Sequence, residues 1–203
     1  LMGAIKRVYA SALSPDALAY RKRRGLHRNT EQMAVLVQRV SGMPYRNWFF
    51  PALAGVAFSR NMYAWTDRID RKQGVIRLVF GLGTRAVERV GGDYPRMIPV
   101  SDPFLRPETG LKIAVHSQHS VDVLYMTANR EVTLPLAEVL RDLDYPGIHH
   151  FVSHRTDDDI QHPISNLVEG PAERLVLTFE NLLRRTDFVS TLGGLLARLD
   201  AAY

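Results

Sequence analysis

The sequence contains no cysteine, and this absence excludes disulfide bridges and metal sites built on thiolates. It also has no apolar run near the roughly 20 residues that a membrane-spanning helix needs. No positively charged segment followed by an apolar stretch and a small-residue cleavage site opens the chain. We therefore expect a cytoplasmic protein without a membrane partner.

Lysine is scarce as well, because 22 of the 26 basic residues are arginine. Arginine suits bidentate contacts with phosphate, and a formal net charge of +5 fits an enzyme that handles anionic substrates. Positive charge is concentrated only in "YRKRRGLHR", residues 20–28. This run could bind nucleic acid, but it also suits the solvated end of a helix, where cations face the negative pole. The second interpretation is favoured, and we do not expect nucleic acid as a partner.

The composition is that of a globular protein, with 46% hydrophobic and 23% charged residues in 203. Helical spacing of apolar residues predicts a helix over 2–12. A second helix should begin after Ser14, a suitable N-cap that is followed by Pro15, and it should stop at Gly25. Further helices are predicted over 84–90, 135–143 and 187–203.

Short runs rich in β-branched residues predict strands. The predicted strands cover 32–40, 53–61, 75–81 and 174–179, with two or three more within 111–135. The connections between the first three are too short for long helices, so we expect them to form one antiparallel sheet. Residues 91–110, which are rich in proline and glycine, are predicted to be a loop.

The most distinctive stretch is "VFGLGTRAVERVGGDYPR", residues 79–96. Gly81 and Gly83 could let backbone N–H groups approach an anion, and Thr84 could cap a short helix whose positive end favours phosphate. The stretch lacks the lysine of a Walker loop and the βαβ unit of a dinucleotide fingerprint. A structural turn is therefore favoured over a phosphate loop on spacing alone, and both interpretations stay open.

Histidines gather in the second half of the chain, next to an acidic run at Asp157–Asp159. They are His116, His119, His149, His150, His154 and His162. Histidine with carboxylate could bind zinc, but the spacing matches no ligand motif, so we predict ordinary surface and loop histidines and no metal site. No nucleophile motif is present, and we expect no catalytic residue in this chain.

Three stretches resemble a known family when they are taken in order: "MAVLVQ" (33–38), "AGVAFSRN" (54–61) and "GLGTRAVERVGGDYPR" (81–96). Together they resemble the N-terminal nucleotide-binding region of the phosphoenolpyruvate synthase and pyruvate phosphate dikinase family. The resemblance implies an α+β, ATP-grasp-like fold with a mainly antiparallel sheet and flanking helices. It also implies that residues 1–203 are part of one such domain, with a helical segment at 1–30 and a mixed α+β part at 31–203.

The same resemblance implies where the nucleotide would bind. Gln38 should lie near the adenine or ribose, with backbone contacts from Val37 and Arg39. The apolar side chains of such a strand would offer a flat wall to the base, and its end would offer directed hydrogen bonds. Gly81, Gly83 and Thr84 are the remaining candidate residues, although the family usually has an acidic residue where this chain has Thr84.

The resemblance further implies a role in a larger enzyme. ATP would bind with Mg²⁺ in a full-length parent, which would pass a phosphoryl group to a carrier histidine and then to pyruvate. The partners would be ATP and the phosphohistidine and pyruvate-binding domains of the parent. The phosphate-binding lysine and arginine should precede Leu1, and the magnesium-binding glutamate and Gln-x-Arg should follow Tyr203, so the chain alone should be inactive.

Two alternatives belong to other functional classes. The chain could be an ATP-sensing module that keeps the fold without the chemistry. It could also be a basic module that binds nucleic acid through residues 20–28, in which case its affinity would fall steeply with salt.

Overall fold

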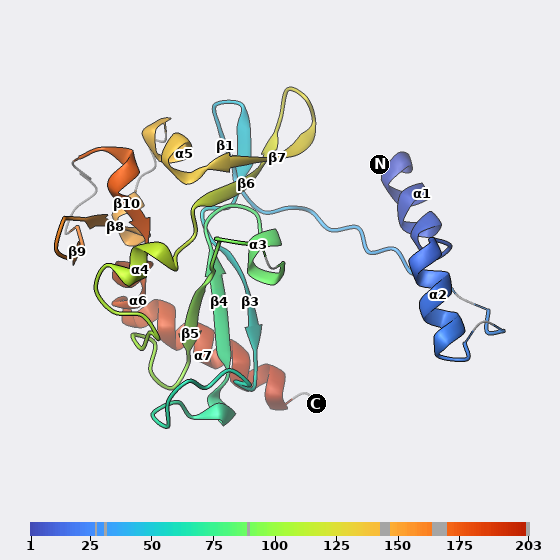
Figure 1. Cartoon of the computed structure of the whole chain (residues 1–203), viewed down its shortest axis with the longest axis horizontal. Helices are drawn as coiled ribbons and strands as arrows, with labels where there is room; N and C mark the ends of the chain where they lie inside the picture. The colour runs from blue at the N-terminus through green and yellow to red at the C-terminus, as the bar shows by residue number, and fades with distance from the viewer. Residues whose placement is uncertain (27, 31, 89, 143–146, 164–169, 202–203) are drawn as a thin grey trace. The chain divides into compact units, whose positions relative to one another are not determined.

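A computed structural model of the chain describes residues 1–26, 28–30, 32–88, 90–142, 147–163 and 170–201 (Figure 1). The chain divides into two compact units, Leu1–Val40 and Ser41–Tyr203, and each is described by itself. The α-helices are α1 (Met2–Ser11), α2 (Pro15–Arg23), α3 (Thr84–Val87), α4 (Lys112–Val115), α5 (Leu136–Asp142), α6 (Glu180–Leu183) and α7 (Thr186–Ala201). The strands are β1 (Met43–Tyr45), β2 (Trp48–Phe50), β3 (Ala54–Phe58), β4 (Val75–Val79), β5 (Arg96–Pro99), β6 (Ser120–Tyr125), β7 (Arg130–Pro135), β8 (Val152–Arg155), β9 (Ile160–Gln161) and β10 (Leu175–Leu177). Three short 3₁₀ helices are η1 (Arg71–Gln73), η2 (Ile148–His150) and η3 (Ala172–Arg174).

The first unit contains the two helices predicted at the start of the chain. The Ser14 hydroxyl accepts a hydrogen bond from the Ala17 N–H at 3.3 Å, and Pro15 occupies the first helical position of α2. Gly25, with φ of 71°, follows the helix where its left-handed backbone conformation is needed. None of the residues in α1 or α2 is buried.

The predicted strand over 32–40 is wrong. These residues form no helix or strand, and most of their side chains are exposed, including Leu36 at 79%. β-branched residues favour a strand only when a neighbouring strand and a buried face are present, because β-propensity mainly reflects packing. Within the described residues, this segment has neither.

The central sheet of the second unit has the order β3-β4-β5, with all pairs antiparallel. Two of its strands were predicted, but the third is β5, which lies inside the predicted loop over 91–110, so that prediction is corrected. Prolines at 95 and 99 made this segment look like a loop in the sequence. The structure accommodates them because proline is tolerated at the ends of an edge strand. One face of the sheet packs through Ile76, Leu78 and Ile98 against α6 and α7.

The second sheet has the order β1-β2-β6-β7. The aromatic-rich segment Met43–Phe50 forms the hairpin β1–β2, and β2 then pairs with β6, which lies far along the chain. Strands β6 and β7 confirm the prediction for most of 111–135, but residues 112–115 form the helix α4 instead. The predicted helices at 135–143 and 187–203 are confirmed as α5 and α7, whose last predicted residues lie outside the described part.

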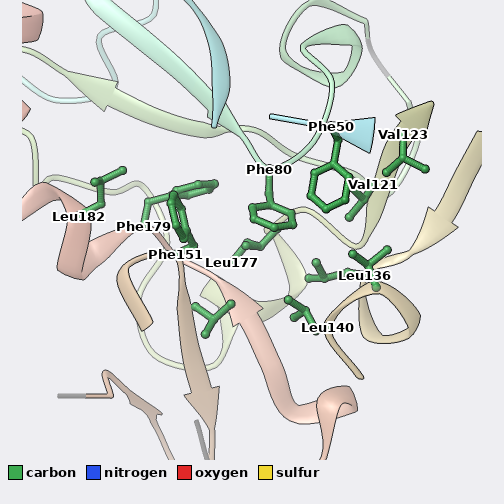
Figure 2. Close-up of a cluster of buried hydrophobic side chains, with 12 residues drawn as sticks. Phe50, Phe80, Val121, Val123, Leu136, Leu140, Phe151, Leu177, Phe179 and Leu182 are labelled. Carbon is green, nitrogen blue, oxygen red and sulfur yellow. The ribbon is translucent and has the colours of Figure 1, made fainter. Parts of the chain in front are cut away.

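The main hydrophobic core joins this sheet to the third sheet, β10-β8-β9 (Figure 2). Phe50 and Phe80 meet edge-on with ring centroids 5.5 Å apart, and Phe151 and Phe179 meet at 6.0 Å. These four rings come from distant parts of the chain and are almost completely buried. The mixture of antiparallel sheets and helices confirms the predicted α+β class.

Candidate functional site

The residues predicted to contact adenine lie in the first compact unit. Val37, Gln38 and Arg39 are all exposed in a segment without regular structure, and 64% of the Val37 surface is accessible. Val37 therefore does not form part of a buried wall within this unit. The other predicted group, Gly81, Gly83 and Thr84, belongs to the second unit.

The glycine turn at 81–84 connects β4 to α3 and packs tightly on β6. Gly81 has φ of 93°, and a Cβ atom there would lie 2.5 Å from Val121 Cγ1 and 2.8 Å from the Asp122 carbonyl oxygen. The Gly81 N–H donates to the Pro51 carbonyl at 3.2 Å, and the Leu82 N–H donates to the Asp122 carbonyl at 2.9 Å. Both N–H groups are therefore engaged within the protein, which supports a structural turn at this point.

Asp122 binds the side chains that follow this turn. Its carboxylate accepts hydrogen bonds from the Thr84 hydroxyl at 2.7 Å, the Thr133 hydroxyl at 2.6 Å and Arg85 Nη2 at 3.1 Å. Burial raises the pKa of Asp122, but the hydrogen bonds from Thr133, Thr84 and Arg85 outweigh it and hold the pKa below 3.8. The Asp122 carboxylate therefore stays ionised at neutral pH.

Arg85 extends this buried network to the second half of the glycine-rich stretch. Its Nη1 atom lies 2.5 Å from Asp93 Oδ2, and both side chains are 8% exposed. The other Asp93 oxygen accepts backbone N–H bonds from His119 and from Ser120, the latter at 3.1 Å. The Arg85 guanidinium thus joins Asp93 to Asp122, and this buried network ties the chain after α3 to β6.

That loop forms one side of a pocket of about 450 Å³ beside the edge strand β5. The pocket is lined by Arg77, Ala86, Glu88, Val90, Gly91, Gly92, Asp93, Tyr94, Pro95, Arg96, Met97, Arg106, Pro107, Glu108 and His116. A concave space of this size, with apolar walls and a few charged groups, is the usual form of a small-molecule site. Gly81, Gly83 and Thr84 do not line it, whereas the later residues of the same stretch do.

Two buried arginines border this pocket and share one carboxylate. Arg106 Nε lies 2.7 Å from Glu180 Oε1, and Arg96 Nη2 lies 3.4 Å from the same oxygen. Burial, followed by repulsion from Arg106, lowers the pKa of Arg96 to about 9. Arg96 also donates to the carbonyls of Met97, Leu105 and Pro103, so it mainly holds β5 to the following loop.

The histidine-rich part contains a row of three hydrogen-bonded side chains that the sequence spacing did not reveal. Ser153 Oγ lies 2.6 Å from His162 Nδ1 and 2.5 Å from Thr178 Oγ1. Ser153 is only 1% exposed, so a substrate cannot reach its hydroxyl. The row of hydrogen bonds therefore serves to satisfy buried polar groups. Burial, the largest effect, lowers the pKa of His162.

Two further searches were confined to the described residues. No group of three or more histidine, aspartate or glutamate side chains among them is placed to hold a metal ion. In the same part of the chain, no helix combines the length and the apolar character that crossing a membrane requires.

Comparison with known families identifies a match. The family described as "Pyruvate phosphate dikinase, AMP/ATP-binding domain" matches residues 1–145, which is more than two thirds of the chain. No curated protein matches the sequence. No solved structure matches it either.

Proposed function

Because the chain belongs to the pyruvate phosphate dikinase AMP/ATP-binding domain family, we propose that it supplies part of the ATP site of a phosphotransferase. In this proposal the enzyme passes a phosphoryl group from ATP to a carrier histidine on another domain and from there to pyruvate. The match over residues 1–145 is the observation that carries the proposal. Positioning and charge neutralisation dominate such a transfer, so a domain that orients ATP contributes directly to the rate.

In this proposal, two segments of the chain contact the nucleotide. Gln38, with the backbone of Val37 and Arg39, contacts the adenine or ribose, and these residues are exposed and open to a ligand in the first unit. Gly81, Gly83 and Thr84 contribute through the turn that Asp122 holds, with phosphate contact left to the N–H groups of Gly83 and Thr84.

We assign no step of the proposed transfer to a residue that binds a metal ion. Mg²⁺ would neutralise the phosphate charge when it enters with ATP. In the proposal, the 203-residue chain binds ATP but does not hydrolyse it or transfer its phosphate. Release of inorganic phosphate above the uncatalysed rate would contradict this part, and would favour a self-sufficient enzyme.

Calorimetric titration of the chain with Mg-ATP tests the proposal. We expect weak binding that Gln38→Ala reduces about tenfold, because the substitution removes a side-chain hydrogen bond to the nucleotide. Gln161→Ala is the matched control, since Gln161 is also exposed but lies on β9 in the second unit. Equal affinities of all three proteins would rule out Gln38 as a nucleotide contact, and no heat at any ATP concentration would rule out binding by this chain.

A further inference from the structure

Arg77 lines the pocket beside β5 and is a half-buried cation without an acidic partner. Among the described residues it forms no ion pair. The other arginines at this pocket differ, because Arg85 is paired with two aspartates, and Arg96 and Arg106 with Glu180. Since a partly buried charge is costly without a partner, the Arg77 guanidinium points to an anionic ligand.

Arg77 is held in a defined orientation. It lies on the central strand β4 between Ile76 and Leu78, which face the α6 and α7 side, so its side chain projects from the opposite face. Its guanidinium carbon lies 5.6 Å from the Phe58 ring centroid and 5.4 Å from that of Tyr63. These rings orient the cation without neutralising it.

The hydrogen-bonding capacity of Arg77 is largely unused. Its buried Nε has no hydrogen-bond partner, and its Nη1 makes one long contact of 3.4 Å with the Ala86 carbonyl. A guanidinium has five donors in a fork that matches the two oxygens of a carboxylate. Arg77 can therefore bind one anionic group in a bidentate manner.

The walls of the pocket suit a flat apolar body attached to that anionic group. Met97 lies directly opposite Arg77 in the β4–β5 ladder, so both side chains share one face of the sheet. Tyr94 and His116 add an aromatic wall, with ring centroids 5.2 Å apart, against which another ring can pack. The volume of about 450 Å³ is at the small end of the range for ligand pockets, which favours a body of one or two rings.

The remaining charges limit the ligand to a single negative charge. Glu88 and Glu108 line the same pocket. Burial is the largest effect on Arg96 and lowers its pKa, whereas Glu108 acts in the opposite direction, so Glu108 is already offset by a cation of the protein. A phosphate monoester carries almost two negative charges at neutral pH, and its second charge would meet these glutamates without a further free guanidinium. A carboxylate needs only Arg77.

We propose that this pocket binds an aromatic monocarboxylate of one or two rings, whose carboxylate is held by Arg77 and whose ring packs against Tyr94 and His116. This site goes beyond the proposed function, because none of the residues assigned to ATP lines the pocket.

Calorimetry on the 203-residue chain with three matched naphthalene compounds tests the ligand chemistry. Naphthalene carboxylate should bind, and its neutral carboxamide should bind about tenfold more weakly, as for the loss of a charged hydrogen bond. Naphthyl phosphate should also bind more weakly than the carboxylate. These comparisons use the original chain, so they do not depend on the folding of any variant.

Variants then test the residues. Arg77→Gln should weaken binding of the carboxylate about tenfold and abolish its advantage over the carboxamide, whereas Tyr94→Ala should weaken both compounds alike. Arg130→Gln is the matched control, because it removes the same charge from an exposed position on β7 and should leave both affinities unchanged. Thermal unfolding of each variant without ligand verifies that the fold is intact.

The results that would overturn the proposal are distinct from those that bear on the ATP site. It is overturned if the carboxylate does not bind, if acid and amide bind equally, or if Arg77→Gln leaves the acid's advantage intact. Tighter binding of naphthyl phosphate would also overturn it. Gln38→Ala and saturating Mg-ATP should leave carboxylate binding unchanged, and displacement by Mg-ATP would show that the pocket belongs to the nucleotide site instead.

Discussion

Asp122 accepts hydrogen bonds from three side chains of two elements, namely Thr84 and Arg85 of α3 and Thr133 of β7. Its carboxylate is also the negative partner of a buried guanidinium. In a low-dielectric environment, loss of a buried acceptor costs more than loss of the attraction alone, because the hydroxyls of Thr84 and Thr133 and one arm of Arg85 would be left without it.

Asp122→Ala should therefore destabilise the protein by about 2–3 kcal/mol, because three hydrogen bonds are lost while Arg85 keeps Asp93 as its ion-pair partner. Urea unfolding monitored by circular dichroism measures the change. Asp187→Ala is the control, since the Arg185–Asp187 pair is half-exposed or more on both sides and should be worth less than about 1 kcal/mol. Comparable losses in the two variants would show that the buried network contributes no more than a surface pair.

The same carboxylate gives stability a defined pH dependence. The folded state lowers the pKa of Asp122 below its ordinary value of 3.8, so its contribution is present above pH 3.8. It should be lost as pH falls through the lower, folded pKa, where Asp122 takes up a proton. Unfolding free energies from pH 6 to pH 2 should fall less steeply in Asp122→Asn than in the original chain, and parallel curves would contradict this assignment.

At the scale of the element, the turn at 81–84 contains two glycines with different requirements. Gly81 has a positive φ and no room for a Cβ, whereas Gly83 has φ of −72° and its nearest Cβ neighbour would be Ala54 Cβ at 3.6 Å. The sequence alone treats the two as one Gly-x-Gly motif. The structure shows that the first is needed for packing against β6 and that the second is not.

Gly81→Ala should destabilise the second unit by at least about 1–3 kcal/mol, from backbone strain together with overlap at Val121. Gly83→Ala should change stability by less than about 1 kcal/mol in either direction. Thermal or urea unfolding of both variants tests the contrast. If Gly83→Ala were the more damaging of the two, the packing explanation for this motif would be wrong.

The predictable elements were those whose signal lies within a few neighbouring residues. Ser14 with Pro15 marks the start of α2, and the runs of β-branched residues in β6 and β7 predict their strands. The predictions of a strand at 32–40 and of a loop over β5 were wrong because strand formation depends on residues far away in the sequence. An edge strand exists because a neighbouring strand pairs with it, and that neighbour cannot be seen in a local window.

At the scale of the whole molecule, the two compact units should differ in their ability to fold independently. The second unit contains all three hydrophobic clusters of the described chain, whereas α1 and α2 have no buried residue. Isolated helices shorter than about 12–15 residues are marginal in water. A core of its own should therefore let the second unit fold by itself.

A chain of residues 41–203 should unfold cooperatively on heating, and a peptide of residues 1–40 should show little helix by circular dichroism. The boundary comes from the division at Val40 and Ser41. A broad, non-cooperative transition for 41–203 would mean that its core needs the first unit. Strong helicity in the peptide would mean that local signals such as the Ser14 cap are sufficient by themselves.

Sequence reasoning reached the family but only part of the candidate site. The resemblance of the three ordered stretches is confirmed by the family match. The roles of Val37, Gln38 and Arg39 stay predictions. The link from Arg85 to Asp122, and the presence of Arg77 and Glu108 in one pocket, join residues more than 30 positions apart. These long-range contacts depend on the register of β4, β5 and β6, which cannot be inferred from composition or spacing.

The pairing of β2 with β6 also bears on how the protein is made. Trp48 and Phe49 lie opposite Tyr125 and Leu124, so their partners leave the ribosome roughly 80 residues later. At about 5–20 residues per second, this is a delay of roughly 4–16 s. During that interval the β1–β2 hairpin, with Trp48, Phe49 and Phe50, has no β6 to pair with, so its apolar side chains are open to aggregation early in synthesis.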